Sequence, residues 1–369
     1  MTHRSRSKVF LLLFGALALF ITSCASSDSD GGDKAAGESF ATCQGKTGEK
    51  DNAAPVGKKG EADGAGKKIG MVFDVGGKGD KSFNDSAFAG LTAAKDNLGV
   101  EVKDLEPSPD GANRAQLMRQ LAEDGYGLII GVGFAFAEVM PDIVKDFPDT
   151  QFAIVDSVVD APNVTNVTFA ANQGSYLVGA AAAQSSKSGT IGFVGGVDTP
   201  LIKEFEAGYV AGAKKVNPDI KVQVKYISTG DDFSGFSNPS KGKTIAEGLY
   251  DAGADVVYHA SGGSGTGVFK AAATRDRLVI GVDSNQYLTS TADEQKCILT
   301  SMLKRVDVGV YGTILDYVKG AKLGGIKVYD LSNDGIGYAT QGGQIKDSAQ
   351  LDELKQEIVD GKIDVPKEP

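Results

Sequence analysis

The sequence predicts an α/β fold with parallel sheets, divided into two lobes on either side of a cleft. Short apolar runs alternate with helical patterns along the body of the chain, which is the order of elements that parallel sheets produce. The body has about 300 residues, too many for one compact core and enough for two lobes. Aspartates stand where several apolar runs stop, and ligands bind at the carboxyl ends of parallel strands.

The body begins with a strand, a glycine-rich turn and a helix, within residues 68–90 (KIGMVFDVGGKGDKSFNDSAFAG). The apolar run stops at Asp74, and the glycines after it let the backbone turn sharply close to a bound molecule. Ser82 or Asn84 is predicted to cap the helix, which we expect to begin near residue 85. This corner therefore places a carboxylate (Asp74), a ring (Phe83) and an amide (Asn84) at the mouth of a cleft.

Strands and helices then alternate along the chain. The predicted strands are 101–105, 127–131, 151–155, 164–169, 189–194, 221–226, 255–259 and 278–282. The predicted helices are 114–123, 134–147, 173–185, 200–216, 244–252, 268–274 and 305–319. Most of these strands are followed by a helical stretch, as parallel sheets require.

Two more aspartates end apolar strands, as Asp74 does. Asp156 follows FAIV and Asp283 follows LVIGV. One aspartate in this position is usually a helix cap or a turn residue, but three are better explained by a polar ligand. A carboxylate accepts two hydrogen bonds from the neighbouring hydroxyls of a ribose, or from the ring N–H and amino groups of a purine.

The N-terminus has the features of a bacterial lipoprotein signal. Three basic residues precede the apolar stretch 9–20, which is too short to span a bilayer comfortably, and Ile-Thr-Ser-Cys follows and ends at Cys24. This tetrapeptide looks like a lipobox, so residues 1–23 are predicted to be a signal peptide and Cys24 a lipidated first residue. Secretion after cleavage at the same place, without lipid, is the alternative.

Residues 24–67 are predicted to be the lipidated cysteine and a flexible linker. The segment is rich in Ser, Asp, Gly, Lys, Ala and Glu, and it has no helical or strand period. The whole chain carries a net charge of −10. Cleavage of the signal would remove three positive charges and make the mature protein more acidic. Binding to nucleic acid is therefore not expected.

Two cysteines remain if Cys24 carries lipid. Cys43 and Cys297 are candidates for one disulfide in an oxidising compartment. The alternative is a free Cys43 in a loop and a buried Cys297 in the apolar run KCILTSML. The sequence does not decide between them.

The motif D-x-G-G-x-x-D-x-S-F-N, followed by A-x-x-G, resembles the basic membrane protein (BMP) family of substrate-binding lipoproteins, which includes purine nucleoside receptors of ABC importers. Further segments resemble the family in the family's order. They are GVGFAF (131–136), FAIVDS (152–157), FAANQGSYLVGAAAA (169–183), 191–218, SGGSGTGVFKAA (261–272), VIGVDSNQ (279–286) and TSMLKRVD (300–307). The resemblance covers the body from Lys68 to about Tyr338.

The resemblance implies a two-lobed type I periplasmic-binding-protein-like fold, in which the chain crosses between the lobes more than once. The crossings are expected near Lys187, Ser284 and Gly320. The N-terminal lobe would then comprise 68–186 and 285–319, and the C-terminal lobe 187–284 and 320–369.

The resemblance also implies roles for four residues. In the family, the residues matching Asp283 and Lys304 hold the sugar, and those matching Phe83 and Phe205 enclose a flat base. At helical spacing Phe205 would otherwise be interpreted as a core aromatic residue. Stacking between two rings tolerates differences between bases, so the pocket is predicted to accept several nucleosides.

Other cleft positions are assigned more generally. The family's matches to Asp74 and Asp156 belong to the ligand cleft, and Asn84 is expected there from its place in the turn before the first helix. The turn SGGSGTG (261–267) offers backbone N–H groups at a helix start, and Gly263 is the ligand-binding residue predicted there.

Signs of an enzyme are weak. His259 is the single histidine after the signal and ends an apolar strand, where a packed or hydrogen-bonded role is expected. Neither metal-ligand spacing nor a nucleophile motif appears, and no cofactor is predicted.

The sequence therefore predicts a monomeric receptor, lipid-anchored on the extracytoplasmic face of the cell membrane, that delivers a purine nucleoside or similar small polar solute to an ABC permease. A nucleoside sensor without transport and a nucleoside-processing enzyme are the alternatives.

Overall fold

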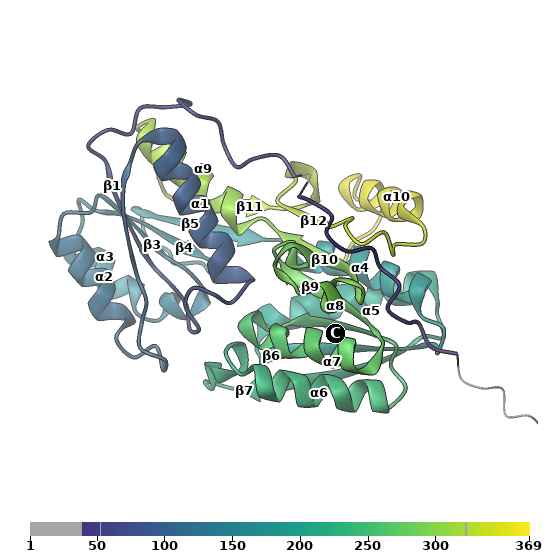
Figure 1. Cartoon of the computed structure of the whole chain (residues 1–369). Coiled ribbons are helices and arrows are strands. Elements are labelled where there is room, and N and C mark those ends of the chain that lie inside the picture. The colour runs from purple at the N-terminus through teal and green to yellow at the C-terminus, as the bar shows by residue number, and fades with distance from the viewer. Residues whose placement is uncertain (1–38, 52, 322) are drawn as a thin grey trace, which may run out of the picture. The chain divides into compact units, whose positions relative to one another are not determined.

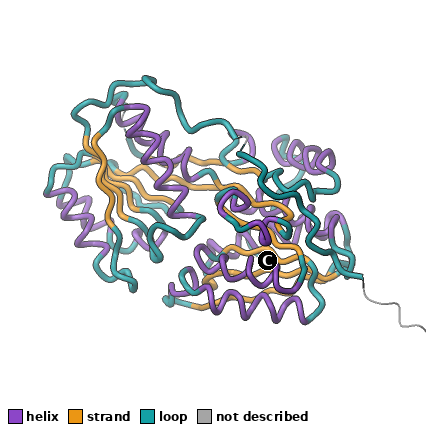
Figure 2. The backbone as a smooth tube through the Cα atoms, in the orientation of Figure 1, coloured by secondary structure: helices purple, strands orange, loops and turns teal. Residues whose placement is uncertain are grey.

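The protein has two lobes, each built on a six-stranded sheet (Figure 1, Figure 2). The computed structural model describes residues 39–51, 53–321 and 323–369, so the predicted signal peptide and Cys24 lie outside the described residues. Neighbouring strands are parallel in both sheets, except that β10 and β12 are antiparallel. The predicted α/β class with parallel sheets is confirmed.

The first sheet has the order β11-β5-β4-β3-β1-β2, and the second has the order β12-β10-β9-β8-β6-β7. The strands of the first sheet are β1 (Lys68–Val72), β2 (Glu101–Leu105), β3 (Leu128–Gly131), β4 (Gln151–Val155), β5 (Val164–Phe169) and β11 (Gly325–Tyr329). Those of the second are β6 (Thr190–Asp198), β7 (Lys221–Thr229), β8 (Val256–Ala260), β9 (Leu278–Asp283), β10 (Ile298–Lys304) and β12 (Ile336–Tyr338).

Helices cover both faces of each sheet (Figure 1), which is why the central strands β3 and β4 are almost entirely apolar rather than alternating. The first lobe contains α1 (Phe83–Leu98), α2 (Arg114–Glu123), α3 (Met140–Asp146) and α9 (Val306–Val318). The second contains α4 (Ala171–Ser185), α5 (Pro200–Val216), α6 (Pro239–Asp251), α7 (Gly265–Arg275), α8 (Ala292–Gln295) and α10 (Ser348–Val359). Within the described part of the chain, no helix combines the length and apolar character needed to cross a membrane.

Most predicted elements are present, and their differences have local causes. The strands predicted at 101–105, 151–155 and 164–169 and the helices at 114–123 and 200–216 have the observed bounds. The helix predicted at 134–147 is instead a 3₁₀ turn, η1 (Phe134–Ala137), followed by α3. Pro141 lies in the first turn of α3, where its missing N–H is tolerated, so a new helix begins there.

The chain crosses between the lobes three times, but not where it was predicted to. The observed crossings lie near Ala170, Arg305 and Asp330, in place of Lys187, Ser284 and Gly320. α4 packs along α5, so the first crossing precedes α4. β10 pairs with β9 in the second sheet and β11 pairs with β5 in the first, which moves the second and third crossings to the ends of these strands. The predicted lobe boundaries are therefore wrong at these three places.

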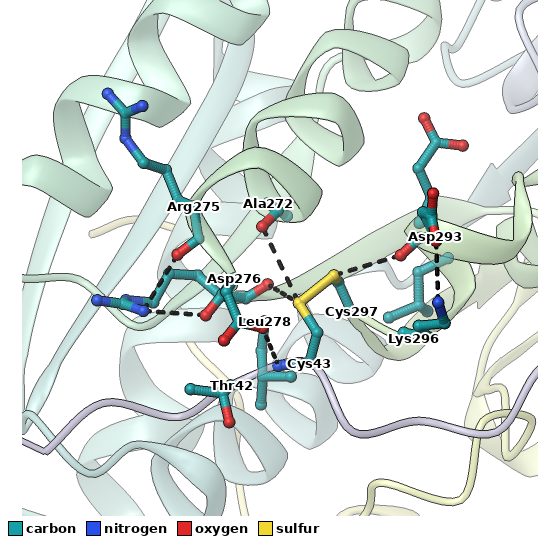
Figure 3. Close-up of a disulfide and its surroundings, with 12 residues drawn as sticks. Thr42, Cys43, Ala272, Arg275, Asp276, Leu278, Asp293, Lys296 and Cys297 are labelled. Carbon is teal, nitrogen blue, oxygen red and sulfur yellow. Dashed lines mark hydrogen bonds and ion pairs between the residues drawn. A yellow bond between two sulfur atoms is a disulfide. The ribbon is translucent and has the colours of Figure 1, made fainter.

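The segment that precedes β1 packs against the body, so the prediction of a flexible linker is wrong for the part of it that the structure describes. We call residues 39–67 the strap. Its first part lies on the second lobe, where the N–H of Ala41 donates to the buried Asp255 carboxylate at 3.0 Å and the N–H of Lys46 donates to the Gly342 carbonyl at 3.0 Å. Cys43 forms a disulfide with Cys297, which precedes β10 (Figure 3).

The strap then continues to the first lobe, as its purple ribbon shows in Figure 1. The N–H groups of Gly60 and Gly64 donate to the carbonyls of Asn97 and Leu98 at the end of α1, at 2.8 and 2.7 Å. The strap is thus a further link between the lobes, beside the three crossings.

Candidate ligand-binding site

A cleft lies where the carboxyl ends of strands from both sheets meet. Asp74, Gly133 and Asp156 follow β1, β3 and β4 of the first lobe. Ala260, Asp283 and Lys304 end β8, β9 and β10 of the second. The empty space is about 560 Å³, including its opening to solvent. The remaining lining residues are Val75, Asp80, Phe83, Asn84, Phe134, Leu201, Ile202, Phe205, Phe236, Ser261, Gly262 and Val282.

Seven of the eight predicted ligand-binding residues line this cleft. They are Asp74, Phe83, Asn84, Asp156, Phe205, Asp283 and Lys304. Gly263 does not; its neighbours Ser261 and Gly262 take its place at the cleft wall. The turn itself borders the cleft, but the sequence could not show which of its residues line it.

Asp74 is fixed by its neighbours, with one oxygen directed toward Gly133. Its own N–H donates to Oδ1 of Asn84 at 3.0 Å, and its Oδ1 accepts the N–H of Val75 at 2.8 Å. A Cβ on Gly133 would lie 2.0 Å from Oδ2 of Asp74, so only glycine leaves room for the carboxylate. Burial raises the pKa of Asp74 to about 6.

The turn before α1 is held by Asp80, which was not predicted as a site residue. Its carboxylate accepts the N–H groups of Ser82, Asn84 and Asp85 at 2.9, 2.8 and 3.1 Å. Asp80 therefore satisfies the free donors of the helix start, the role expected for Ser82 or Asn84. The second aspartate of the D-x-G-G-x-x-D motif was the available signal for it.

The Ser82 side chain does not cap α1 but links the two lobes. Its hydroxyl donates to Oδ2 of Asp283 at 2.5 Å, while the hydroxyl of Ser284 donates back to the Ser82 carbonyl at 3.0 Å. These contacts tie the start of α1 to the end of β9.

Asp156, Asp283 and Lys304 form a buried charged group at one end of the cleft. The Lys304 ammonium pairs with Asp156 and lies 3.8 Å from Oδ1 of Asp283. Both aspartates have left-handed backbone, with φ of 63° and 62°, a conformation that Asp tolerates better than most residues. Burial raises the pKa of Asp283, and the Lys304 charge opposes that rise.

Aromatic rings surround the Lys304 ammonium. Its nitrogen lies 4.5 Å from the ring centre of Phe83 on α1 and 5.6 Å from that of Phe205 on α5. Phe169, which was not predicted, is 5.4 Å away at the end of β5. The cleft therefore combines charged hydrogen-bonding groups with ring faces from both lobes, which suits a molecule with one polar and one flat apolar part.

Helix packing fixes the position of Phe205. α5 crosses α4 with backbones in contact, since a Cβ on Gly212 would lie 1.9 Å from the Tyr176 carbonyl oxygen and one on Gly208 would lie 2.1 Å from that of Asn172. Thr199 accepts the N–H of Ile202 and so caps the start of α5. Phe205 thus stands on a rigid helix, six residues after its cap Thr199.

His259 has a structural role, as predicted. It is fully buried, and its ring nitrogens lie 3.2 Å from the Ser261 hydroxyl and 3.0 Å from Oε1 of Gln286. Burial lowers the pKa of His259 to about 4, so the ring is neutral at neutral pH.

Two α/β lobes with a polar and aromatic cleft between them define a two-domain solute-binding protein. Residues 67–368 match the family model of PnrA-like ABC transporter substrate-binding proteins, and the chain belongs to that Bmp family.

Known proteins resemble most of the chain. It is 38% identical to a nucleoside-binding protein of an ABC transporter, BmpA from Lactococcus lactis, over 81% of this chain and 89% of that protein. It is also 37% identical to a CD4+ T-cell-stimulating antigen of Listeria monocytogenes, over 82% of this chain and 88% of that protein. A solved ABC transporter solute-binding protein from Aeropyrum pernix K1 has a TM-score of 0.71 at 28% identity, covering 81% of this chain and 94% of that one.

Proposed function

We propose that this protein binds a purine nucleoside between its lobes and delivers it to the permease of an ABC importer. The observation that carries the proposal is the arrangement around Lys304. Asp156 and Asp283 supply acceptors for neighbouring hydroxyls, while Phe83 and Phe205 present rings from opposite lobes. The Lactococcus relative, named as nucleoside-binding, supports the same ligand class.

The proposed mechanism is binding without chemistry. The base stacks against Phe83 and Phe205, and the ribose hydroxyls donate to the buried carboxylates. Closure of the lobes excludes water from these contacts, and the ligand selects the closed form. We propose no catalytic step and no cofactor, and we propose that the protein acts as a monomer without binding nucleic acid.

Calorimetry on ligand-stripped protein tests the ligand class. Adenosine, guanosine and inosine should bind at least tenfold more tightly than their 2′,3′-dideoxy forms or the free bases, because those compounds lack the ribose hydroxyls that would donate to the buried carboxylates. Equal affinity for nucleosides and free bases would show that the charged group does not hold the sugar. Absence of binding for all three nucleosides would refute the proposed ligand.

Binding is also expected to depend on pH through Asp74. Its pKa is raised to about 6 in the ligand-free protein, so the carboxyl is ionised at pH 7.5 and neutral below about pH 6. If it accepts a hydrogen bond from the ligand, affinity falls as pH drops through 6, by up to roughly tenfold per pH unit below that value. Calorimetry from pH 7.5 to 5 measures this fall. The Asp74→Asn variant should bind more weakly at pH 7.5 and show a flatter profile; a steep fall retained in that variant would contradict the assignment.

We further propose that Cys24 carries lipid and holds the protein at the extracytoplasmic face of the membrane. The Cys24→Ser variant should then remain as unprocessed precursor and lose metabolic lipid labelling, since lipid attachment needs the thiol. Wild-type protein labelled in parallel is the control. Lipid labelling that persists in the variant would refute lipidation at Cys24.

A further inference from the structure

Two short turns meet across the rim of the cleft, one from each lobe. η1 (Phe134–Ala137) carries Phe134, and η2 (Phe233–Phe236) carries Phe233 and Phe236. The ring centre of Phe134 lies 5.5 Å from that of Phe233 and 6.4 Å from that of Phe236, both edge to face. We call these three residues the aromatic rim. Phe134 and Phe236 also line the cleft, whereas Phe233 is outside its lining.

A buried arginine of the first lobe also lies beside Phe233. The guanidinium carbon of Arg114 is 6.0 Å from the centre of the Phe233 ring and 5.8 Å from that of Phe136. Arg114 is only 8% exposed, and its Nε and Nη2 form no hydrogen bond with any described residue. Its guanidinium therefore contacts a ring of its own lobe and a ring of the other lobe, and the second contact is available only when the lobes meet.

η2 presents Phe233 from a rigid platform. The Ser228 hydroxyl donates to the Asp232 carbonyl at 2.5 Å, and the Ser264 hydroxyl donates to the Gly235 carbonyl at 2.7 Å. Gly235 is packed so tightly that a Cβ would lie 2.1 Å from the Gly196 carbonyl oxygen. Since the turn is already ordered within the second lobe, little conformational entropy is lost when Phe233 meets the first lobe.

From this arrangement we propose that Phe233 is a positioning residue that retains the ligand by latching the closed lobes, through Phe134 and Arg114, without touching the ligand. The proposal rests on the proposed function, in which a nucleoside occupies the cleft. Contacts that exist only in the closed form stabilise that form against opening. They act on the dissociation rate, because the ligand leaves only after the rim separates, and they do not read the base.

Stopped-flow measurement of guanosine, adenosine and inosine dissociation tests the latch. Phe233→Ala should raise the dissociation rate of all three by roughly tenfold, with the association rate changed less than about threefold. The melting temperature of the ligand-free variant should stay at the wild-type value. Phe40→Ala is the matched control, because Phe40 also lies against an arginine, 4.0 Å from the guanidinium carbon of Arg277, but away from the cleft. It should leave the dissociation rate unchanged.

An unchanged dissociation rate in Phe233→Ala would overturn the latch, as would an effect confined to one base, which would make Phe233 a ligand contact. Failure of wild-type protein to bind any of the three would refute the nucleoside ligand instead. The latch can then be tested without ligand in a Phe134→Cys/Phe233→Cys variant that keeps the native disulfide. Cross-linking of the new pair by a short bifunctional maleimide, whose spacer replaces the reach of the two rings, is expected; no cross-link would show that the rim does not close.

Discussion

Replacing Asp283 with alanine is expected to weaken guanosine binding by about tenfold to a hundredfold. The Asp283 carboxylate is buried at the end of β9, accepts the Ser82 hydroxyl and lies 3.8 Å from the Lys304 ammonium. Its loss removes an acceptor for the ribose and leaves buried donors unpaired. The variant should also lose most of its preference for guanosine over 2′,3′-dideoxyguanosine. Without the Asp283 carboxylate, the ribose hydroxyls of guanosine have no acceptor there, so their presence adds little to the affinity. Calorimetry with both ligands measures the two effects together.

Asp255→Asn is a suitable control for this experiment. Asp255 is also a buried aspartate of the second lobe, but its carboxylate accepts the N–H groups of Ala41, Lys187 and Ser188 rather than facing the cleft. The substitution should lower the melting temperature and leave guanosine affinity unchanged. If Asp283→Ala bound guanosine as tightly as wild type while losing stability, Asp283 would be a structural residue like Asp255.

Removal of the disulfide is expected to lower the free energy of unfolding by about 2–4 kcal/mol. The bond joins Cys43 in the strap to Cys297 before β10, residues separated by 254 positions, so it closes a long loop and restricts the unfolded chain (Figure 3). In the folded protein it also holds the strap beside Asp255 and Asp276, whose carboxylates accept the N–H groups of Ala41 and Cys43. Chemical denaturation of the Cys43→Ser/Cys297→Ser variant, beside wild type, measures the loss.

A reducing agent provides the internal control for this prediction. It should lower the stability of wild-type protein toward that of the double variant and leave the double variant unchanged. Thiol counting on denatured, unreduced mature wild-type protein should find no free cysteine. Two titratable thiols would show that the bond does not form in the protein.

The sequence was most informative about strands whose burial follows directly from the pattern of apolar residues, and about the residues at their ends. A strand buried on both faces appears as a continuous apolar run, so β4, which contains FAIV, was predicted with its observed bounds. Because side chains at strand ends project toward the ligand edge of a parallel sheet, Asp74, Asp156 and Asp283 were placed in the cleft from their positions alone. Phe83 was also placed at the cleft by the corner that follows β1. Phe205 and Lys304 needed the family resemblance, since a phenylalanine at helical spacing usually belongs to a core.

Long-range pairing accounts for what was missed. The run ILTSMLK was visible as an apolar segment, yet its membership of the second sheet as β10 depends on its pairing with β9, and the local pattern does not record that pairing. β11 has two exposed apolar residues, Ile326 and Val328, and lies at the edge of its sheet beside β5, so its burial pattern is weak. These pairings fix the crossings, and the crossings set the lobe boundaries.

By itself the sequence determined the α/β class, most of the elements, the aspartates at the strand ends and the motif that marks the family. Each of these depends on residues close together in the chain, where burial, capping and backbone preference act locally. Only the tertiary structure decided which strands share a sheet, that Cys43 meets Cys297, that the strap packs on both lobes, and that Arg114 and Phe233 face each other across the rim. The disulfide and the contact between Arg114 and Phe233 join residues more than a hundred positions apart. The strand order and the path of the strap depend on how whole elements fit together in space, which no local pattern of residues records.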